Sequence, residues 1–182
     1  AATGQRSEDL ILDSCRRNAQ KTALVDASCG RRLTYAEYGE IIETLARNLI
    51  ATGIQPGEMV AIFLANSWEF CTAYHAATLA GAIPTLLNPT YREREVRYQL
   101  ENSGAVLLIT DGGNIEGINL GGLPCLRRVY TTRQPASGAD GTASRPEGHQ
   151  TLLAALPGDS KDAGIQIQAP VAVVVEKGGL GR

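Results

Sequence analysis

Closely spaced metal ligands are missing from this sequence. Its cysteines stand far apart, without a C-x-x-C pair, and its two histidines are also distant from each other. These residues are Cys15, Cys29, Cys71, Cys125, His75 and His149. Zinc sites use closely spaced pairs of such ligands, so the spacing counts against a zinc site. Isolated cysteines are typical of a reducing compartment, and the sequence therefore predicts a cytoplasmic protein.

An excess of charge of one sign is missing as well. The 17 Lys and Arg residues are balanced by 19 Asp and Glu residues, which gives a formal net charge of −2. A nucleic-acid partner or an anionic membrane favours a basic patch, and none is visible. No apolar run approaches the roughly 20 residues of a membrane-spanning helix. The polar start AATGQRSEDL does not form a secretory signal. We therefore expect no nucleic-acid partner and no membrane span.

The common catalytic patterns are missing too. The sequence has no Ser/His/Asp set, no pair of carboxylates at helical spacing and no G-x-G-x-x-G after a predicted strand. It consequently predicts no catalytic residue, no cofactor-binding residue and no metal ligand in this chain.

Short apolar runs alternate with helical segments in the centre of the chain. The predicted strands are Val60–Leu64, Ile83–Leu87 and Val106–Thr110, and the predicted helices are Trp68–Ala80 and Tyr91–Asn102. This alternation, with its short connections, indicates a parallel sheet with crossover helices. We therefore predict an α/β fold, a three-layer Rossmann-like and mostly parallel sheet with helices on both faces. The length of 182 residues suits one such domain.

Further elements are predicted before this unit. A helix over Glu8–Asn18, with Ser7 as its cap, precedes a β-hairpin made of Thr22–Ala27 and Arg32–Thr34.

Two helix starts show the pattern of a capping box, in which a hydroxyl and a carboxylate three residues later each accept a backbone N–H. The first is Thr34 with Glu37, at the start of a helix that is predicted to reach Thr52. The second is Thr90 with Glu93, at the start of the second central helix.

The C-terminal third is predicted to be rich in loops. A strand is expected within residues 126–131, a flexible loop over 134–148, a helical turn over 152–156, a buried strand over 171–175 and a disordered or non-native tail over 176–182.

Three segments resemble the N-terminal part of the adenylate-forming enzymes. This superfamily includes acyl-CoA synthetases, some of them enzymes of fatty acid metabolism, 4-coumarate–CoA ligases, luciferases and nonribosomal adenylation domains. The segments are LTYAEYGE (33–40), VAIFLANSWEF (60–70) and LAGAIPTLLNPTYREREVRYQLENSGAVLLIT (79–110). They stand in the family's order, and the third is most similar to the acyl- and aryl-CoA ligase branch. The likeness covers residues 8–131 and extends more weakly to Val175.

The resemblance implies a function for the complete enzyme. Members of this family join a carboxylic acid to ATP with the help of Mg²⁺, and they pass the acyl group to CoA or another thiol. Their phosphate loop is rich in Ser, Thr and Gly, whereas here the predicted strand 171–175 continues into EKGGLGR. Backbone amides of Gly178, Gly179 and Gly181 are a weak candidate for binding an anion, and a frayed tail is the simpler reading.

We therefore expect an N-terminal subdomain, residues 1–182, that binds no ATP, Mg²⁺ or CoA alone and is inactive. An apolar face that the missing part covers would then promote self-association. The alternative is a stand-alone binding or interaction module that kept the fold and lost the chemistry.

Five residues are candidates for a functional site. His75, Trp68 and Tyr74 are candidates for lining an acyl pocket, but core positions are the more common role of a lone histidine and of aromatic residues at helical spacing. Asp111 follows a strand at the edge where ligands of α/β sheets bind, although the glycines after it favour a turn role. Asn88 precedes a proline and is predicted to redirect the chain.

Overall fold

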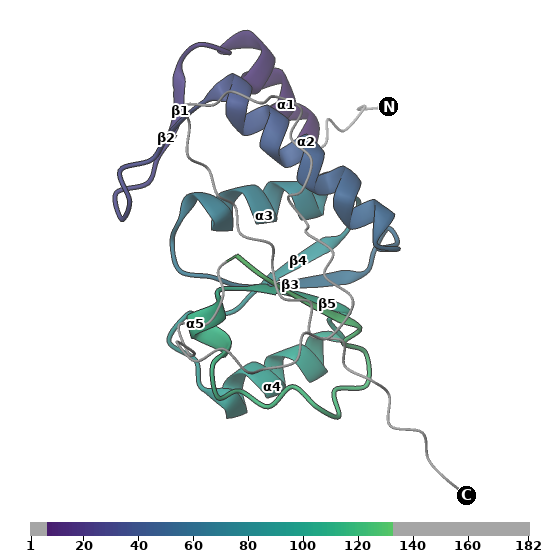
Figure 1. Cartoon of the computed structure of the whole chain (residues 1–182). Coiled ribbons are helices and arrows are strands. Elements are labelled where there is room, and N and C mark those ends of the chain that lie inside the picture. The colour runs from purple at the N-terminus through teal and green to yellow at the C-terminus, as the bar shows by residue number, and fades with distance from the viewer. Residues whose placement is uncertain (1–6, 133–182) are drawn as a thin grey trace, which may run out of the picture.

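The computed structural model describes residues 7–132, and its elements follow the predicted alternation of strands and helices (Figure 1). In chain order they are α1 (Ser7–Arg17), β1 (Thr22–Val25), β2 (Arg32–Thr34), α2 (Tyr35–Ala51), β3 (Met59–Phe63), α3 (Trp68–Leu79), β4 (Ile83–Leu86), α4 (Glu93–Ser103), β5 (Leu107–Thr110), α5 (Gly112–Ile115) and β6 (Arg128–Thr131).

The described part contains one parallel sheet of four strands in the order β4-β3-β5-β6. Val60 of β3 lies opposite Pro84 of β4 on one side and opposite Leu107 of β5 on the other. The three central apolar runs therefore lie side by side and point the same way, as predicted. β1 and β2 pair antiparallel, which confirms the N-terminal hairpin.

The sheet has a different apolar layer on each face, because successive side chains of a strand point to opposite faces. On one face, Val60 and Ile62 pack with residues of α2 and α3, among them Leu49 and the small Ala76. On the other face, Ala61 and Phe63 pack with Val96 and Leu100 of α4. Figure 1 shows α3 next to the sheet with α2 outside it, and α4 on the opposite side. The predicted three-layer arrangement is confirmed.

A smaller cluster attaches α1 and the hairpin to this sandwich. Its buried members are Cys15, Leu33, Tyr38, Ile41, Ile42 and Trp68. They come from α1, β2, α2 and α3, so the N-terminal elements pack on the outer side of the α2–α3 pair.

The predicted capping box at Thr34 is confirmed. The Glu37 amide donates to Thr34 Oγ1 at 3.3 Å, and the Thr34 amide donates to a Glu37 carboxylate oxygen at 2.8 Å. Ser67 caps α3 in a similar way, since its Oγ accepts from the Phe70 amide at 3.2 Å. Both caps satisfy N–H groups that have no partner inside the helix.

The second predicted capping box, at Thr90, is wrong. The Thr90 amide and hydroxyl both donate to Asn88 Oδ1, at 3.0 and 2.9 Å. α4 begins later, at Glu93, and a Glu95 carboxylate oxygen accepts from the Arg92 amide at 3.1 Å. The Asn88 side chain offers Thr90 an acceptor only two residues away, so a local turn wins over the helix start.

Some predictions concern residues that the structure does not describe. These are the loop 134–148, the helical turn 152–156, the strand 171–175 and the tail 176–182, so they remain predictions. Among the helices between residues 7 and 132, none has both the length and the apolarity that a membrane crossing needs.

Candidate functional site

The strand order creates a switch point at the carboxyl edge of the sheet. The chain goes from β3 to β4 on one side, and then crosses to β5 on the other side of β3. The connections after β3 and β5 therefore leave the sheet in different directions. In open α/β sheets, the crevice at such a point is the usual place for a ligand.

Hydrogen bonds join the ends of β3 and β5 at this point. The carbonyl oxygen of Phe63 accepts from Thr110 Oγ1 at 3.1 Å and from Asn114 Nδ2 at 3.2 Å. Thr110 is fully buried. Asp111 caps the short helix α5, because its Oδ1 accepts from the Gly113 amide at 2.8 Å. The predicted turn role of Asp111 is thereby confirmed.

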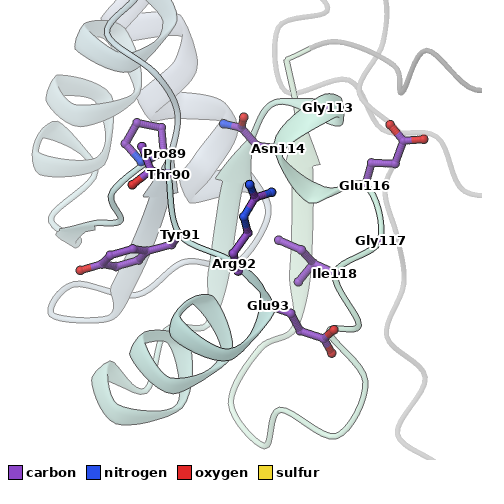
Figure 2. A pocket seen from close by; sticks show the side chains of 10 residues that line it. All are labelled: Pro89, Thr90, Tyr91, Arg92, Glu93, Gly113, Asn114, Glu116, Gly117 and Ile118. Atoms are coloured by element: carbon purple, nitrogen blue, oxygen red, sulfur yellow. The ribbon is translucent and has the colours of Figure 1, made fainter.

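A cavity of about 530 Å³ opens beside these strand ends. Two connections line it, residues 89–93 between β4 and α4, and residues 113–118 in and after α5. Figure 2 shows the Arg92 side chain in the middle of the cavity, with its guanidinium directed toward Asn114, while Tyr91 and Glu116 point away. The lining therefore combines hydrogen-bond donors, from Arg92 and Asn114, with the carboxylates of Glu93 and Glu116.

The side chains at the cavity can bind an anionic or carbonyl group. A guanidinium beside a side-chain amide can hydrogen-bond oxygen atoms of an anionic or carbonyl group. The lining contains no His, Cys or Lys, and its acidic residues are Glu93 and Glu116. Between residues 7 and 132, no group of three His, Cys, Asp or Glu side chains is placed to hold a metal ion. The absence of catalytic, cofactor-binding and metal-binding residues from the chain stays a prediction.

His75 lies away from the cavity, between α2 and α3. Its Nδ1 is hydrogen-bonded to the Tyr38 hydroxyl at 2.6 Å, and Tyr38 and Tyr74 contact the ring edge-on. Burial lowers the pKa of His75, and hydrogen bonding with the Cys71 backbone partly opposes this change. Burial also raises the pKa of Tyr38. His75 therefore has a partly buried structural position, as expected, and not a place in the candidate site.

Trp68 is buried where the hairpin meets the start of α3. Its backbone amide donates to Asp26 Oδ2 at 2.9 Å, and the Arg31 guanidinium lies 3.9 Å from the ring centroid. Asp26 also accepts from the Ser28 hydroxyl and amide, at 2.5 and 2.8 Å. The Ser28 hydroxyl, followed by the Trp68 amide, lowers the pKa of Asp26 to about 2. Trp68 is a core residue that also anchors the hairpin.

Two residues that line the cavity, Arg92 and Asn114, are not among the residues predicted from the sequence. Each follows a predicted strand within a few residues, Arg92 after β4 and Asn114 after β5. The carboxyl ends of parallel strands share one edge of a sheet, so a polar residue shortly after a predicted strand is the sequence signal for such a site. The predicted role of Asn88 in redirecting the chain is confirmed, because its Oδ1 accepts from the Thr90 amide and hydroxyl.

Comparison with known proteins identifies the family. A sequence profile of the AMP-binding enzymes matches residues 11–173. The chain belongs to the AMP-binding enzyme family. This AMP-binding family member is 42 % identical over 104 residues to triostin synthetase I of Streptomyces triostinicus, across 57 % of the chain and 19 % of that protein. It is 36 % identical over 104 residues to 4-coumarate–CoA ligase 3 of Arabidopsis thaliana, across 57 % of the chain and 18 % of that protein.

Solved structures support the same assignment. The O-succinylbenzoate coenzyme A synthetase of Bacillus subtilis, in complex with AMP, matches this family member with a TM-score of 0.52 and 31 % identity. The match covers 57 % of the chain and 27 % of the synthetase. The same synthetase has also been solved with ATP and a magnesium ion. The chain thus spans roughly a fifth of the curated relatives described above, 19 and 18 % of their lengths.

Proposed function

We propose that this chain is the N-terminal part of an ATP-dependent acyl- or aryl-CoA ligase. The complete enzyme would activate a carboxylic acid as an acyl-adenylate and transfer the acyl group to CoA. The observation that carries the proposal is the family match over residues 11–173, together with the 36 % identity to a 4-coumarate–CoA ligase.

We expect this chain to form no acyl-adenylate by itself. Adenylate formation needs positive groups to offset the phosphate charge, and in this family Mg²⁺ is one of them. Between residues 7 and 132 no group of three His, Cys, Asp or Glu side chains is placed to hold a metal ion, and the segment 176–182 reads EKGGLGR without a Ser or Thr cluster. The residues that bind Mg²⁺ and the phosphates would then come from the rest of a complete enzyme.

Exchange of labelled pyrophosphate into ATP, dependent on an added carboxylic acid, tests this function. The assay compares the 182-residue chain with the complete product of the gene that encodes it. The acids should include 4-coumarate, benzoate, a long-chain fatty acid and amino acids. We expect exchange with the complete product and none with the chain alone. Exchange by the chain alone would contradict its expected inactivity. Exchange by neither protein would favour a non-catalytic module.

A second candidate is the adenylation unit of a nonribosomal peptide synthetase. The 42 % identity to triostin synthetase I favours it. The two candidates differ in the thiol that receives the acyl group. Release of AMP that depends on free CoA supports the ligase, whereas loading of a carrier-protein thiol with no response to CoA supports the synthetase.

A further inference from the structure

The segment between α5 and β6, residues 116–127, supplies part of one wall of the candidate cavity. Gly117 and Ile118 belong to this wall, and residues 89–93, before and at the start of α4, form the other (Figure 2). The backbone turns at Gly117 and again at Gly122, where φ is +76° and +77°, angles that favour glycine. The chain changes direction at both ends of the piece 117–122, so the position of this piece depends on the contacts that hold it.

A guanidinium group of α4 supplies such contacts. Arg97 Nη1 donates to the main-chain carbonyl of Asn119 and, at 2.9 Å, to that of Gly121. Both carbonyls belong to one turn, because Asn119 Oδ1 accepts from the Gly121 amide at 2.8 Å. Hydrogen bonds with a charged donor are stronger than those between neutral groups. Arg97 is thus the polar anchor of the piece 117–122, and the buried Leu120 is its apolar anchor.

Arg97 connects the two walls of the cavity. It stands four residues after Glu93, which lines the cavity, so both side chains lie on the same side of α4. The carbonyl of Asn119 that it binds comes directly after Ile118, a lining residue of the opposite wall. The Arg97 side chain is half-buried, whereas Arg94 of the same helix is exposed. The separation of the two walls therefore depends on the two hydrogen bonds of Arg97.

We propose that Arg97 is a positioning residue of the candidate site, which sets the separation of the cavity walls. The inference rests on the proposed function, in which one substrate of the ligase enters this crevice. Without Arg97, the piece 117–122 would turn at its glycines, and Gly117 and Ile118 would lose their fixed place opposite Glu93. A ligand would then bind more weakly, because part of its binding energy would have to order the wall. Arg97 is not one of the lining residues, so we expect an effect on binding and not on the chemical step.

Amide hydrogen exchange of the 182-residue chain tests the contact itself. Arg97→Met keeps most of the aliphatic stem and removes the guanidinium group. We expect the amides of residues 117–122 to exchange about tenfold faster in this variant, while the amides of β3 keep their rates. Arg94→Met removes an exposed guanidinium from the same helix, so it is the matched control and should change neither group of amides.

Steady-state kinetics of the complete gene product test the role in positioning. The KM values are measured for ATP, for CoA and for the carboxylic acid that supports pyrophosphate exchange in the parent. In Arg97→Met we expect the KM of one of the three to rise about fivefold, while kcat stays within about twofold of the parent. Arg97→Lys should recover part of this loss, because its ammonium group can reach one of the two carbonyls. Arg94→Met should have the kinetic constants of the parent.

Several results would overturn the proposal. Unchanged hydrogen exchange of residues 117–122 in Arg97→Met would show that Arg97 does not hold this piece, and faster hydrogen exchange throughout the chain would show a general loss of stability instead. In an active complete product, unchanged KM values, a rise of all three together or a fall in kcat alone would contradict a role in positioning. A parent product without pyrophosphate exchange contradicts the proposed function, whereas hydrogen exchange of the 182-residue chain does not depend on activity, so the two failures are distinguishable.

Discussion

Gly39 provides the sharpest test of how α1 packs on α2. It is buried inside α2, where an alanine would normally be favoured over glycine by about 1 kcal/mol. A Cβ at this position would lie 3.1 Å from Cys15 Cβ and 3.4 Å from Cys15 Sγ. The Cβ of Cys15 is fixed to the backbone of α1, so this backbone would have to shift by a few tenths of an ångström. Overpacking of this kind costs about 1–3 kcal/mol.

We therefore expect Gly39→Ala to destabilise the chain by about 1 kcal/mol, the difference between the packing cost and the gain in helix propensity. Urea unfolding followed by far-UV circular dichroism measures it. With a slope of about 2 kcal/mol per molar urea, the midpoint should fall by about 0.5 M. The exposed neighbour Glu40 gives the control, because Glu40→Ala against Glu40→Gly reports propensity without packing. A Gly39→Ala variant more stable than the parent would refute the reasoning, since propensity alone would then decide.

Three further predictions concern caps and buried ionisable groups. Thr34→Ala removes the hydroxyl from the capping box with Glu37 and should cost about 1 kcal/mol in the same urea experiment, and no change would mean that the box is not formed in solution. The pKa of His75 is lowered in the folded state, so the unfolded state binds a proton first, and the free energy of unfolding should fall as the pH drops below about 6.5. His75→Gln should flatten this part of the pH profile of the urea midpoint. An unchanged profile would contradict the assignment. The pKa of Asp26 is lowered to about 2, so its contribution to stability should be complete above about pH 4 and disappear as the pH falls toward 2. Thermal unfolding at several pH values should therefore show a smaller drop in melting temperature at acid pH in Asp26→Asn than in the parent. Equal drops in the two proteins would contradict this prediction.

The central fold could be predicted because its signals are local and repeated. Apolar runs of strand length alternate with helical segments, and their short connections leave few alternatives to a parallel sheet. The capping box at Thr34 follows from two residues in one turn. These features depend on neighbours in the sequence, and the structure confirms them.

The start of α4 and the candidate site depend on choices that the sequence leaves open. Thr90 has a possible partner in Glu93 and another in Asn88, and the nearer amide oxygen wins. Arg92 and Asn114 line one cavity because β4 and β5 are parallel and their carboxyl ends lie at the same edge of the sheet, on either side of β3. This shared edge exists only in the packed sheet, so neighbours in the sequence do not reveal it.

The outer edge of β4 bears on how the chain is synthesised, because Pro84 has no N–H and the Leu86 carbonyl already accepts from Gln99 Nε2. A nascent polypeptide emerges from the ribosome with its N-terminal elements first, so β3, β4 and α4 leave the exit tunnel before β5 and β6. Once Gln99 has emerged and reached Leu86, the outer edge of β4 offers fewer hydrogen bonds to another strand than the open side of β3 does. Later strands of the same chain then join more readily beside β3, and neighbouring nascent chains on one messenger RNA pair less readily with β4.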